Sequence, residues 1–462
     1  MTKKVHPYIP NMVPEVKEEM LKEIGVESTM ELYSCIPEEL LFQGEMNIPK
    51  ALTEHELRRH IDRLLNKNVC ANEYLNFLGA GCWQHFVPAV CDEINQRSEF
   101  LTAYAGEPYE DHGRYQALFE YQSLLAELVD MDVVNVPTFD WGQAAATSLR
   151  MAGRITGRKK VLLAKTVSPE REKIIINYGT PELEFGVIGN DKDTGLLNLD
   201  DLKNQISDDI AAIYFENPSY LGFIESQGTE ISEIAREHGV LIVVGVDPIS
   251  LGVITPPSRY GADIVCGDLQ PLGMHMNYSG GQAGFIATRN EEKFVNEFPS
   301  RLFGIVPTVK KGEYGFGDVA YDRTSFALRE KGKESVGTQT ALWGITAGVY
   351  LSLLGPNGMY ELGQTIMQNS QYAVKKLNKI PGVKGSRLNS PFFKEFIVDF
   401  NETNLSVETI NERLQERKIF GGKDLSTEFP EYGQSALYCV TEIHSQEDID
   451  QLITALEEIV KN

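Results

Sequence analysis

Short apolar runs separated by helix-length polar segments dominate the chain from about residue 71 to residue 329. The clearest runs are rich in Val, Ile and Leu, are three to seven residues long, and occupy residues 161–164, 210–215, 240–246 and 264–266. Apolar runs without polar alternation indicate strands that are buried on both faces. We therefore predict an α/β domain over residues 71–329, with a mostly parallel central sheet and helices on both faces.

The pattern becomes helical after this region. Residues 337–354 have helical periodicity, and a second helical pattern continues to residue 377. The sequence Gly355-Pro356-Asn357-Gly358 lies between the two. Because Gly and Pro disfavour helix interiors, we expect a break there.

Strand signals follow these helices. Residues 396–400 and 436–441 read as strands, and a final helix is expected after Ser445, where Asp448 can complete a capping box. Helices beside alternating strands predict a separate C-terminal α+β small domain over residues 330–462.

The first 70 residues differ from both regions. They are charged, they contain several prolines that act as breakers, and their clearest amphipathic piece is residues 53–65. We predict an N-terminal helical extension, residues 1–70, that packs on another surface.

Composition narrows the classes of partner. The chain has 462 residues, 42% of them hydrophobic, and its 43 basic and 66 acidic residues give a formal charge of -23. This charge disfavours sequence-independent binding to nucleic acid or to anionic membranes. No apolar stretch reaches the roughly 18 residues that span a bilayer, and no apolar signal segment follows Lys3 and Lys4.

Neither the cysteines nor the histidines form a metal-binding pattern. The six cysteines are scattered without a Cys-x-x-Cys pair, which is typical of reduced thiols in a cytoplasmic protein. His55 and His60 are five positions apart, about 140° around a helix, so they do not share a face.

The glycine-rich words do not match nucleotide-binding fingerprints. Gly79-Ala80-Gly81 resembles the start of a dinucleotide loop, but Gln84 stands where the third glycine belongs and no clear strand precedes the loop. Residues 153–160 lack the P-loop spacing. A nucleotide-binding dehydrogenase is therefore disfavoured.

Asp247 is the strongest candidate site residue. It follows the most apolar strand, at the carboxyl edge where open α/β sheets bind ligands. If it is buried it needs a cationic partner. It could equally be a turn or N-cap carboxylate for the next segment. In pyridoxal phosphate enzymes a carboxylate in this position holds the pyridinium nitrogen protonated.

Such an enzyme also needs a lysine shortly downstream for its Schiff base. No lysine occurs between Lys203 and Lys293. The loop after Asp247 therefore cannot supply this bond.

With these residues, several longer words resemble one family, the alpha subunit (subunit 1) of the split glycine decarboxylase, which is the P protein of the glycine cleavage system. The words are FLGAGCWQHFVPAV (77–90), QALFEYQ (116–122), ENPSYLGFIE (216–225), VVGVDPISLGV (243–253), GADIVCGDLQPLG (261–273), LSLLGPNG (351–358) and ALYCVTE (436–442), together with the opening HPYIPN (6–11).

The resemblance implies a fold type I pyridoxal phosphate-dependent transferase architecture. It implies a heterotetramer in which a homologous beta subunit carries the Schiff-base lysine and binds the coenzyme covalently, while Gln270 stands at the corresponding position here. No catalytic residue is then expected in this chain, and the chain alone would be inactive. The shared enzyme decarboxylates glycine and passes the aminomethyl group to the lipoyl arm of the H protein.

The resemblance also implies a contact across the subunit interface. Gly337-Thr338-Gln339 matches a Gly-Thr pair that, in related aminotransferases, binds the phosphate of the neighbouring subunit's coenzyme, and a helix N-terminus suits a phosphate. Thr338 as an ordinary N-cap is the alternative.

Some words depart from the family pattern, notably residues 104–114, residues 139–143 and Ser279-Gly280-Gly281. Two further hypotheses therefore stay open. One is a diverged paralogue in a heteromeric pyridoxal phosphate enzyme that acts on another amino acid. The other is a non-catalytic scaffold or regulatory subunit. Polar residues expected near the cleft, or equally at packing or surface positions, are His85, His112, Arg114 and Asp140.

Overall fold

The computed structural model describes residues 8–42, 44–101, 114–279, 282–334 and 339–461. The chain divides into two compact units, Met1–Val69 and Cys70–Asn462. The boundary predicted at residue 70 lies next to this division. The boundary predicted at residue 330 lies inside the second unit and stays a prediction.

The first unit consists of short helices. They are η1 (Pro10–Met12), α1 (Pro14–Ile24), η2 (Thr29–Tyr33), η3 (Glu38–Leu40) and α2 (Glu54–Leu65). Helix α2 begins with a capping box between Thr53 and Glu56, which confirms the helix predicted over residues 53–65. None of the described residues in this unit is buried. That the extension packs on another surface stays a prediction.

A seven-stranded sheet forms the centre of the second unit, with the order β2-β8-β7-β6-β5-β3-β4. Its strands are β2 (Val133–Val134), β3 (Lys160–Ala164), β4 (Glu184–Ile188), β5 (Ile210–Glu216), β6 (Leu241–Val246), β7 (Ile264–Asp268) and β8 (Gly284–Thr288). Strand β8 pairs antiparallel with β7 and β2, and every other pair is parallel. The four predicted apolar runs form β3, β5, β6 and β7, which confirms a mostly parallel sheet.

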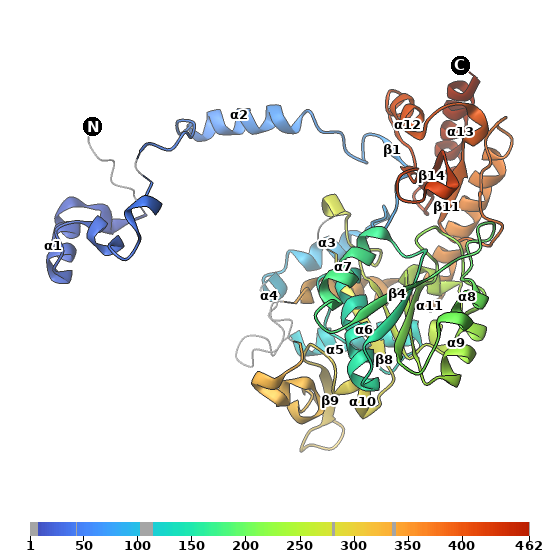
Figure 1. The fold of residues 1–462 in the computed structure, drawn as a ribbon. Helices are drawn as coiled ribbons and strands as arrows, with labels where there is room; N and C mark the ends of the chain where they lie inside the picture. The colour runs from blue at the N-terminus through green and yellow to red at the C-terminus, as the bar shows by residue number, and fades with distance from the viewer. Residues whose placement is uncertain (1–7, 43, 102–113, 280–281, 335–338, 462) are drawn as a thin grey trace. The chain divides into compact units, whose positions relative to one another are not determined.

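Helices cover both faces of this sheet (Figure 1). Helices α6 (Trp141–Thr156) and α7 (Pro169–Gly179) lie on one face, and α8 (Leu199–Gln205) and α9 (Gly228–Glu237) lie on the other. The chain moves outward from β3 to β4 and then back through β5 and β6. Because parallel crossovers are right-handed, the helices of these two directions must lie on opposite faces.

Shorter elements complete the region around the sheet. They are α3 (Ala89–Asn95), α4 (Ser98–Leu101), α5 (Tyr115–Val129), η5 (Pro248–Gly252), η6 (Pro257–Tyr260), η7 (Asn277–Ser279), α10 (Glu292–Val295), η8 (Tyr321–Arg323) and η9 (Ser325–Lys331). Strands β9 (Phe303–Pro307) and β10 (Tyr314–Asp318) form an antiparallel hairpin.

The C-terminal part matches the predicted elements. Helix α11 (Ala341–Leu377) is interrupted at Gly355, which has φ 60° and ψ −175°, so the predicted break is confirmed. Strands β11 (Glu395–Asp399), β14 (Ser435–Cys439) and β13 (Lys423–Asp424) form a three-stranded antiparallel sheet. The remaining elements are η10 (Asn401–Thr403), α12 (Val407–Gln415), η11 (Pro430–Tyr432) and α13 (Gln446–Lys461).

Two details at the ends of this region bear on the predictions. The capping box of α13 is present, because Asp448 N donates to Ser445 Oγ and Ser445 N donates to Asp448 Oδ2. The view that no strand precedes Gly79 is wrong, since β1 (Leu75–Asn76) pairs parallel with β12 (Ile419–Phe420). A two-residue strand is too short to leave a hydrophobic pattern.

The loop after β1 lies against the start of β11, not against a ligand. Ala80 N donates to Glu395 Oε1 at 2.6 Å. A Cβ atom on Gly79 would lie 2.3 Å from the same oxygen, so the glycine allows the carboxylate to approach the backbone. The Gly79-Ala80-Gly81 word is therefore explained by packing against β11.

Gly222 provides a second close approach to β11, and its replacement should be costly. Its φ is +90°, and a Cβ atom there would lie 2.0 Å from the Glu395 carbonyl oxygen. We expect Gly222→Ala to lower the free energy of unfolding by roughly 2–5 kcal/mol, because it combines a left-handed alanine with an overpacked site. Chemical denaturation of the full chain measures this.

Gly157→Ala is the matched control. Gly157 also has a positive φ, +69°, but nothing lies within 4 Å of its Cβ position. Its cost should be only the backbone term of about 1–2 kcal/mol. Equal costs for the two variants would show that the contact with β11 does not constrain Gly222.

Candidate functional site

Three carboxylates meet at the carboxyl ends of the central strands. Glu216 is the last residue of β5, Asp247 directly follows β6, and Asp268 is the last residue of β7. Their exposed fractions are 3%, 4% and 1%. Because the three strands are neighbours and parallel, their ends lie at one edge of the sheet. The protein must therefore balance or neutralise several buried negative charges at this edge.

Asp247 is both a cap for the next helix and a buried acid with a cationic partner, the two possibilities that the sequence left open. Its Oδ1 accepts a hydrogen bond of 3.1 Å from Ile249 N, so it caps η5. Its Oδ2 lies 2.8 Å from Lys394 Nζ, and the two side chains are 5% and 3% exposed. The cation that a buried Asp247 requires therefore comes from the residue just before β11.

Lys394 joins Asp247 to a longer polar chain. Its Nζ lies 3.6 Å from the ring centroid of Trp83 and 3.1 Å from His85 Nε2. His85 Nδ1 lies 2.8 Å from Glu442 Oε2. Since an ammonium group can only donate, His85 Nε2 accepts and Nδ1–H donates to Glu442. The imidazole thus connects the lysine to a second carboxylate.

Gln270, at the position expected for the Schiff-base lysine, is fully buried and its amide is engaged. Its Oε1 accepts from Trp83 N at 3.1 Å, and its Nε2 donates to Trp83 O at 3.0 Å and to Met274 O at 3.1 Å. These bonds hold the backbone of Trp83 against the loop after β7.

Arg171 of α7 balances the charge of Glu216. The guanidinium makes a two-point pair with the carboxylate, with Nε–Oε1 2.6 Å and NH2–Oε2 2.8 Å. It also lies 4.1 Å from the ring centroid of Trp141. Burial lowers the pKa of Arg171, but the charge and hydrogen bonds of Glu216 outweigh it and raise the pKa above the ordinary value.

Two other acids respond to burial in a different way. Burial raises the pKa of Asp268 to about 7, although the backbone N–H groups of Gln270, Ala283 and Trp141 oppose the change. Burial also raises the pKa of Glu395, against the hydrogen bond from Ala80 and the charge of Lys394. Protonation can therefore remove part of the excess negative charge at this edge.

The residues around Asp247 do not fit a bound pyridoxal phosphate. The oxygen that would face a pyridinium nitrogen faces Lys394, and the cavity beside it measures about 10 Å³. That volume holds about one water molecule, whereas ligand pockets measure about 300–1,000 Å³. The side chains of Trp83, Trp141 and Lys394 fill this part of the fold.

The predicted residues 139–143 build a helix cap. Asp140 Oδ1 accepts from Gln143 N at 2.7 Å, and Phe139 N donates to Gln143 Oε1 at 2.8 Å. Asp140 is therefore the N-cap of α6, and burial raises its pKa. Trp141, the first residue of the helix, lines the small cavity beside Asp247.

The remaining predicted residues lie away from Asp247 or outside the described residues. Arg114 is buried and its Nε donates to Glu99 O at 2.9 Å. His112 and Thr338 fall outside the described residues. The N-cap of α11 is Thr340, two positions after Thr338. Gln339 is 8% exposed, and its Oε1 has no hydrogen-bond partner among the described residues.

Sequence reasoning missed Lys394, Arg171, Glu216 and Trp83. Glu216 carried the same signal as Asp247, an acid at the end of a buried strand, and could have been found. Lys394 could not, because a lysine before a strand usually lies at the surface.

The sheet order and the buried strand-end acid define an α/β protein with the fold type I architecture of pyridoxal phosphate-dependent enzymes. A Burkholderia pseudomallei sphingosine-1-phosphate lyase shares this fold, with a TM-score of 0.65 and 13% identity over 91% of this chain and 93% of that chain. The family model of the glycine cleavage system P-protein matches residues 6–456. The chain belongs to this family.

Individual relatives agree with this family. A probable glycine dehydrogenase (decarboxylating) subunit 1 from Staphylothermus marinus is 39% identical over 98% of both chains, and one from Saccharolobus islandicus is 40% identical over 98% of both. The crystal structure of an inhibitor-bound glycine decarboxylase (P-protein) has a TM-score of 0.84 and 31% identity, covering 99% of this chain and 100% of that chain.

Two negative findings concern the described part of the chain. It contains no group of three or more His, Cys, Asp or Glu side chains placed to hold a metal ion. Its helices are also too short or too polar to cross a membrane.

Removing the cation beside Asp247 should be costly. We expect Lys394→Met to lower the free energy of unfolding by about 3–5 kcal/mol, because it leaves Asp247 buried and unpaired. The double variant Lys394→Met/Asp247→Asn should recover most of this loss, since the amide oxygen can still cap η5. Denaturation midpoints of the full chain measure both.

Lys376→Met is the matched control, because Lys376 pairs with Asp450 at the surface, with side chains 31% and 47% exposed. Exposed pairs contribute little to stability. A loss for Lys394→Met as small as that for Lys376→Met would contradict a buried, essential pair.

Asp268 should give the chain a distinctive pH dependence. Its folded pKa of about 7 lies above the unfolded value of about 3.9, so the folded state keeps its proton to higher pH. Its contribution to stability is therefore complete below pH about 4 and is lost as the pH rises to about 7. In Asp268→Asn this decline should disappear from the curve of unfolding free energy against pH.

The slope is the readout, because the amide nitrogen of Asp268→Asn cannot accept the Trp141 N–H and the variant should be less stable at every pH. Identical slopes for the variant and the parent chain would show that Asp268 is ionised well below pH 7.

Proposed function

We propose that the chain is the alpha subunit of a glycine decarboxylase. This lysine-less subunit lacks the Schiff-base lysine, and it works with a homologous beta subunit that carries this lysine. The enzyme would decarboxylate glycine and transfer the aminomethyl group to the lipoyl arm of the H protein. Membership of the P-protein family and the two relatives named subunit 1 support this proposal. We further propose a heterotetramer and a cytoplasmic location; six free cysteines support the latter.

One observation supports a division of tasks between two subunits: side chains fill the space at the carboxyl edge of the central sheet, beside Asp247. Asp247 is paired with Lys394, Gln270 is bonded on both sides of its amide, and the cavity beside Asp247 holds about one water molecule. A chain built in this way needs a partner to bind the coenzyme covalently. It would be inactive alone.

We also propose that this chain acts on the partner's coenzyme through Thr338 and Gln339, as ligands of the phosphate. The flanking residues are firmly held. Glu334 is 3% exposed and pairs with Arg150 at 3.1 Å and Arg154 at 3.2 Å. On the other side, Thr340 Oγ1 donates to Thr138 O at 2.7 Å. Two anchored ends and the unpartnered oxygen of Gln339 support a positioning role for this segment.

The test is co-expression of this chain with a candidate lysine-bearing subunit. We expect a coloured complex that catalyses carbon dioxide exchange with glycine. After borohydride reduction, mass spectrometry should find the pyridoxyl group on the partner only. The control is a complex in which the partner's Schiff-base lysine is replaced by alanine, and it should be colourless and inactive.

Each other outcome counts against a stated part of the proposal. A pyridoxyl group on this chain would overturn the lysine-less subunit. Exchange with another amino acid but not with glycine would favour the diverged paralogue, which the altered words at 104–114 and 139–143 suggest. Full activity of the partner alone would favour a scaffold or regulatory subunit.

A further inference from the structure

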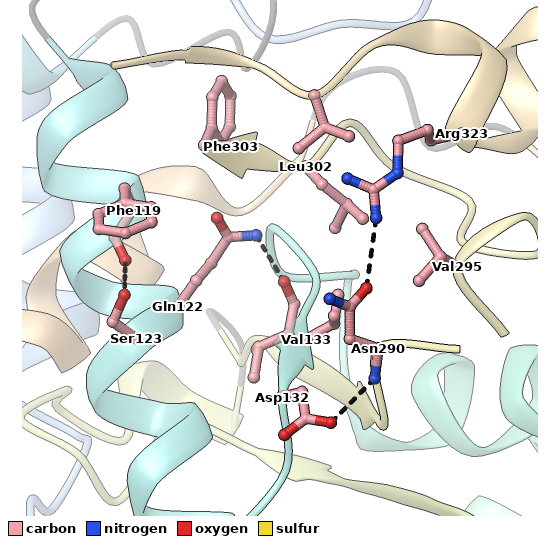
Figure 2. Close-up of a pocket in the computed structure, with 12 residues that line it drawn as sticks. Phe119, Gln122, Ser123, Asp132, Val133, Asn290, Val295, Leu302, Phe303 and Arg323 are labelled. Atoms are coloured by element: carbon pink, nitrogen blue, oxygen red, sulfur yellow. Dashed lines mark hydrogen bonds between the residues drawn. The ribbon is translucent and has the colours of Figure 1, made fainter. Parts of the chain in front are cut away.

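A second cavity, of about 180 Å³, lies at the edge of the central sheet between α5, β2 and β9. It shares no lining residue with the small cavity beside Asp247. Figure 2 shows that its walls come from elements far apart in the sequence, with Phe119, Leu302 and Phe303 supplying apolar surface. Its volume is well above the roughly 10–15 Å³ that one water molecule needs and below the roughly 300–1,000 Å³ of pockets for larger ligands, so it suits a small molecule.

Gln122 places an unpartnered acceptor in this cavity. The side chain is 7% exposed, and its Nε2 donates to the Val134 carbonyl oxygen. Its Oε1 has no hydrogen-bond partner among the described residues, and in Figure 2 it points away from Val133 into the cavity. A buried amide oxygen without a donor costs about 1–3 kcal/mol. A ligand that fills this cavity should therefore present a hydrogen-bond donor to Gln122.

Arg323 supplies a positive charge at the opposite wall. Its NH2 donates to Asn290 Oδ1 at 3.3 Å, which uses one of the five N–H donors of a guanidinium. Figure 2 shows the guanidinium directed toward the interior of the group of lining residues. A planar fork of donors suits a carboxylate. The ligand should therefore carry a carboxylate that reaches Arg323.

Asp132 distinguishes a zwitterion from a plain anion. Its carboxylate also lines the cavity, accepts from Asn290 N at 3.0 Å and lies 3.6 Å from Arg289 NH1. A ligand that has a positive group beside its carboxylate would be attracted to both Asp132 and Arg323. A plain anion would be attracted to Arg323 but repelled by Asp132.

We propose that this cavity is a binding site for a small α-amino acid. The carboxylate would bind Arg323, the ammonium group would donate to Gln122 Oε1, and a short apolar side chain would contact Phe119, Leu302 and Phe303. The proposal does not depend on the proposed function, because it uses none of the residues around Asp247 and requires neither a coenzyme nor a partner.

Calorimetric titration of the purified full chain tests the site, with L-valine as the probe. We expect binding with a Kd of about 1 mM or tighter. Isovalerate, which lacks the amino group, and 2-hydroxyisovalerate, which replaces it with a hydroxyl group, should bind at least about tenfold more weakly, since neither carries the positive charge. Tighter binding of the hydroxy acid would reject an amino acid as the ligand.

Two variants of the cavity and one control locate the binding. Arg323→Gln removes the charge, and Ser123→Leu adds apolar volume at a helix position whose hydroxyl bonds only its own helix, to Phe119 O. Each should weaken L-valine binding at least about tenfold, which is at least about 1.4 kcal/mol. Arg259→Gln should bind as the parent chain does, because Arg259 is an exposed arginine paired with Asp130 outside the cavity.

Three results would overturn the proposal. The first is no heat of binding with the parent chain, which would mean that water alone fills the cavity. The second is unchanged L-valine binding in Arg323→Gln. The third is a loss of binding in Arg259→Gln equal to that in Arg323→Gln. Because Arg323 is exposed, its replacement should leave the fold intact, and a far-ultraviolet circular dichroism spectrum matching the parent chain would establish this.

Discussion

The ion pair between Lys394 and Asp247 is the interaction on which the rest of this edge of the sheet depends. A parallel sheet brings strand-end carboxylates together, and each buried charge must be paired or protonated. Replacing a buried ion pair by apolar groups is often neutral, but removing one partner is costly. Once Asp247 is present and buried, the fold therefore requires a cation beside it. Lys394 meets this requirement from the residue before β11, and so connects the small sheet to the large one.

The other residues of the edge can be understood as consequences of this pair. Trp83 lies over the ammonium group of Lys394, Gln270 holds the backbone of Trp83, and His85 passes the contact to Glu442. Arg171 pairs with the buried carboxylate of Glu216 as Lys394 pairs with that of Asp247. Burial raises the pKa of Asp268 to about 7, so this acid accommodates burial by keeping its proton. Pairing and protonation are thus two solutions to one problem, applied to neighbouring strands.

The elements of the fold were accessible from sequence, whereas the contents of the site were only partly so. Apolar runs located β3, β5, β6 and β7, because a strand buried on both faces leaves a continuous hydrophobic run. The acid after β6 could be placed at the sheet edge for the same reason. The cation opposite it could not, because Lys394 reaches Asp247 only when the residue before β11 comes next to the residue after β6, and nothing in the local pattern around Lys394 records that contact.

The packing of side chains at this edge of the sheet also explains one of the segments that depart from the family pattern. Residues 139–143 differ from the usual family pattern. In the structure these residues cap α6 and place Trp141 between Arg171 and Tyr214, with its Nε1 donating to Tyr214 Oη at 3.0 Å. Their chemistry is therefore that of closing a space. Side chains that close a space leave no room for a substrate beside them, which agrees with the proposed division of labour between two chains.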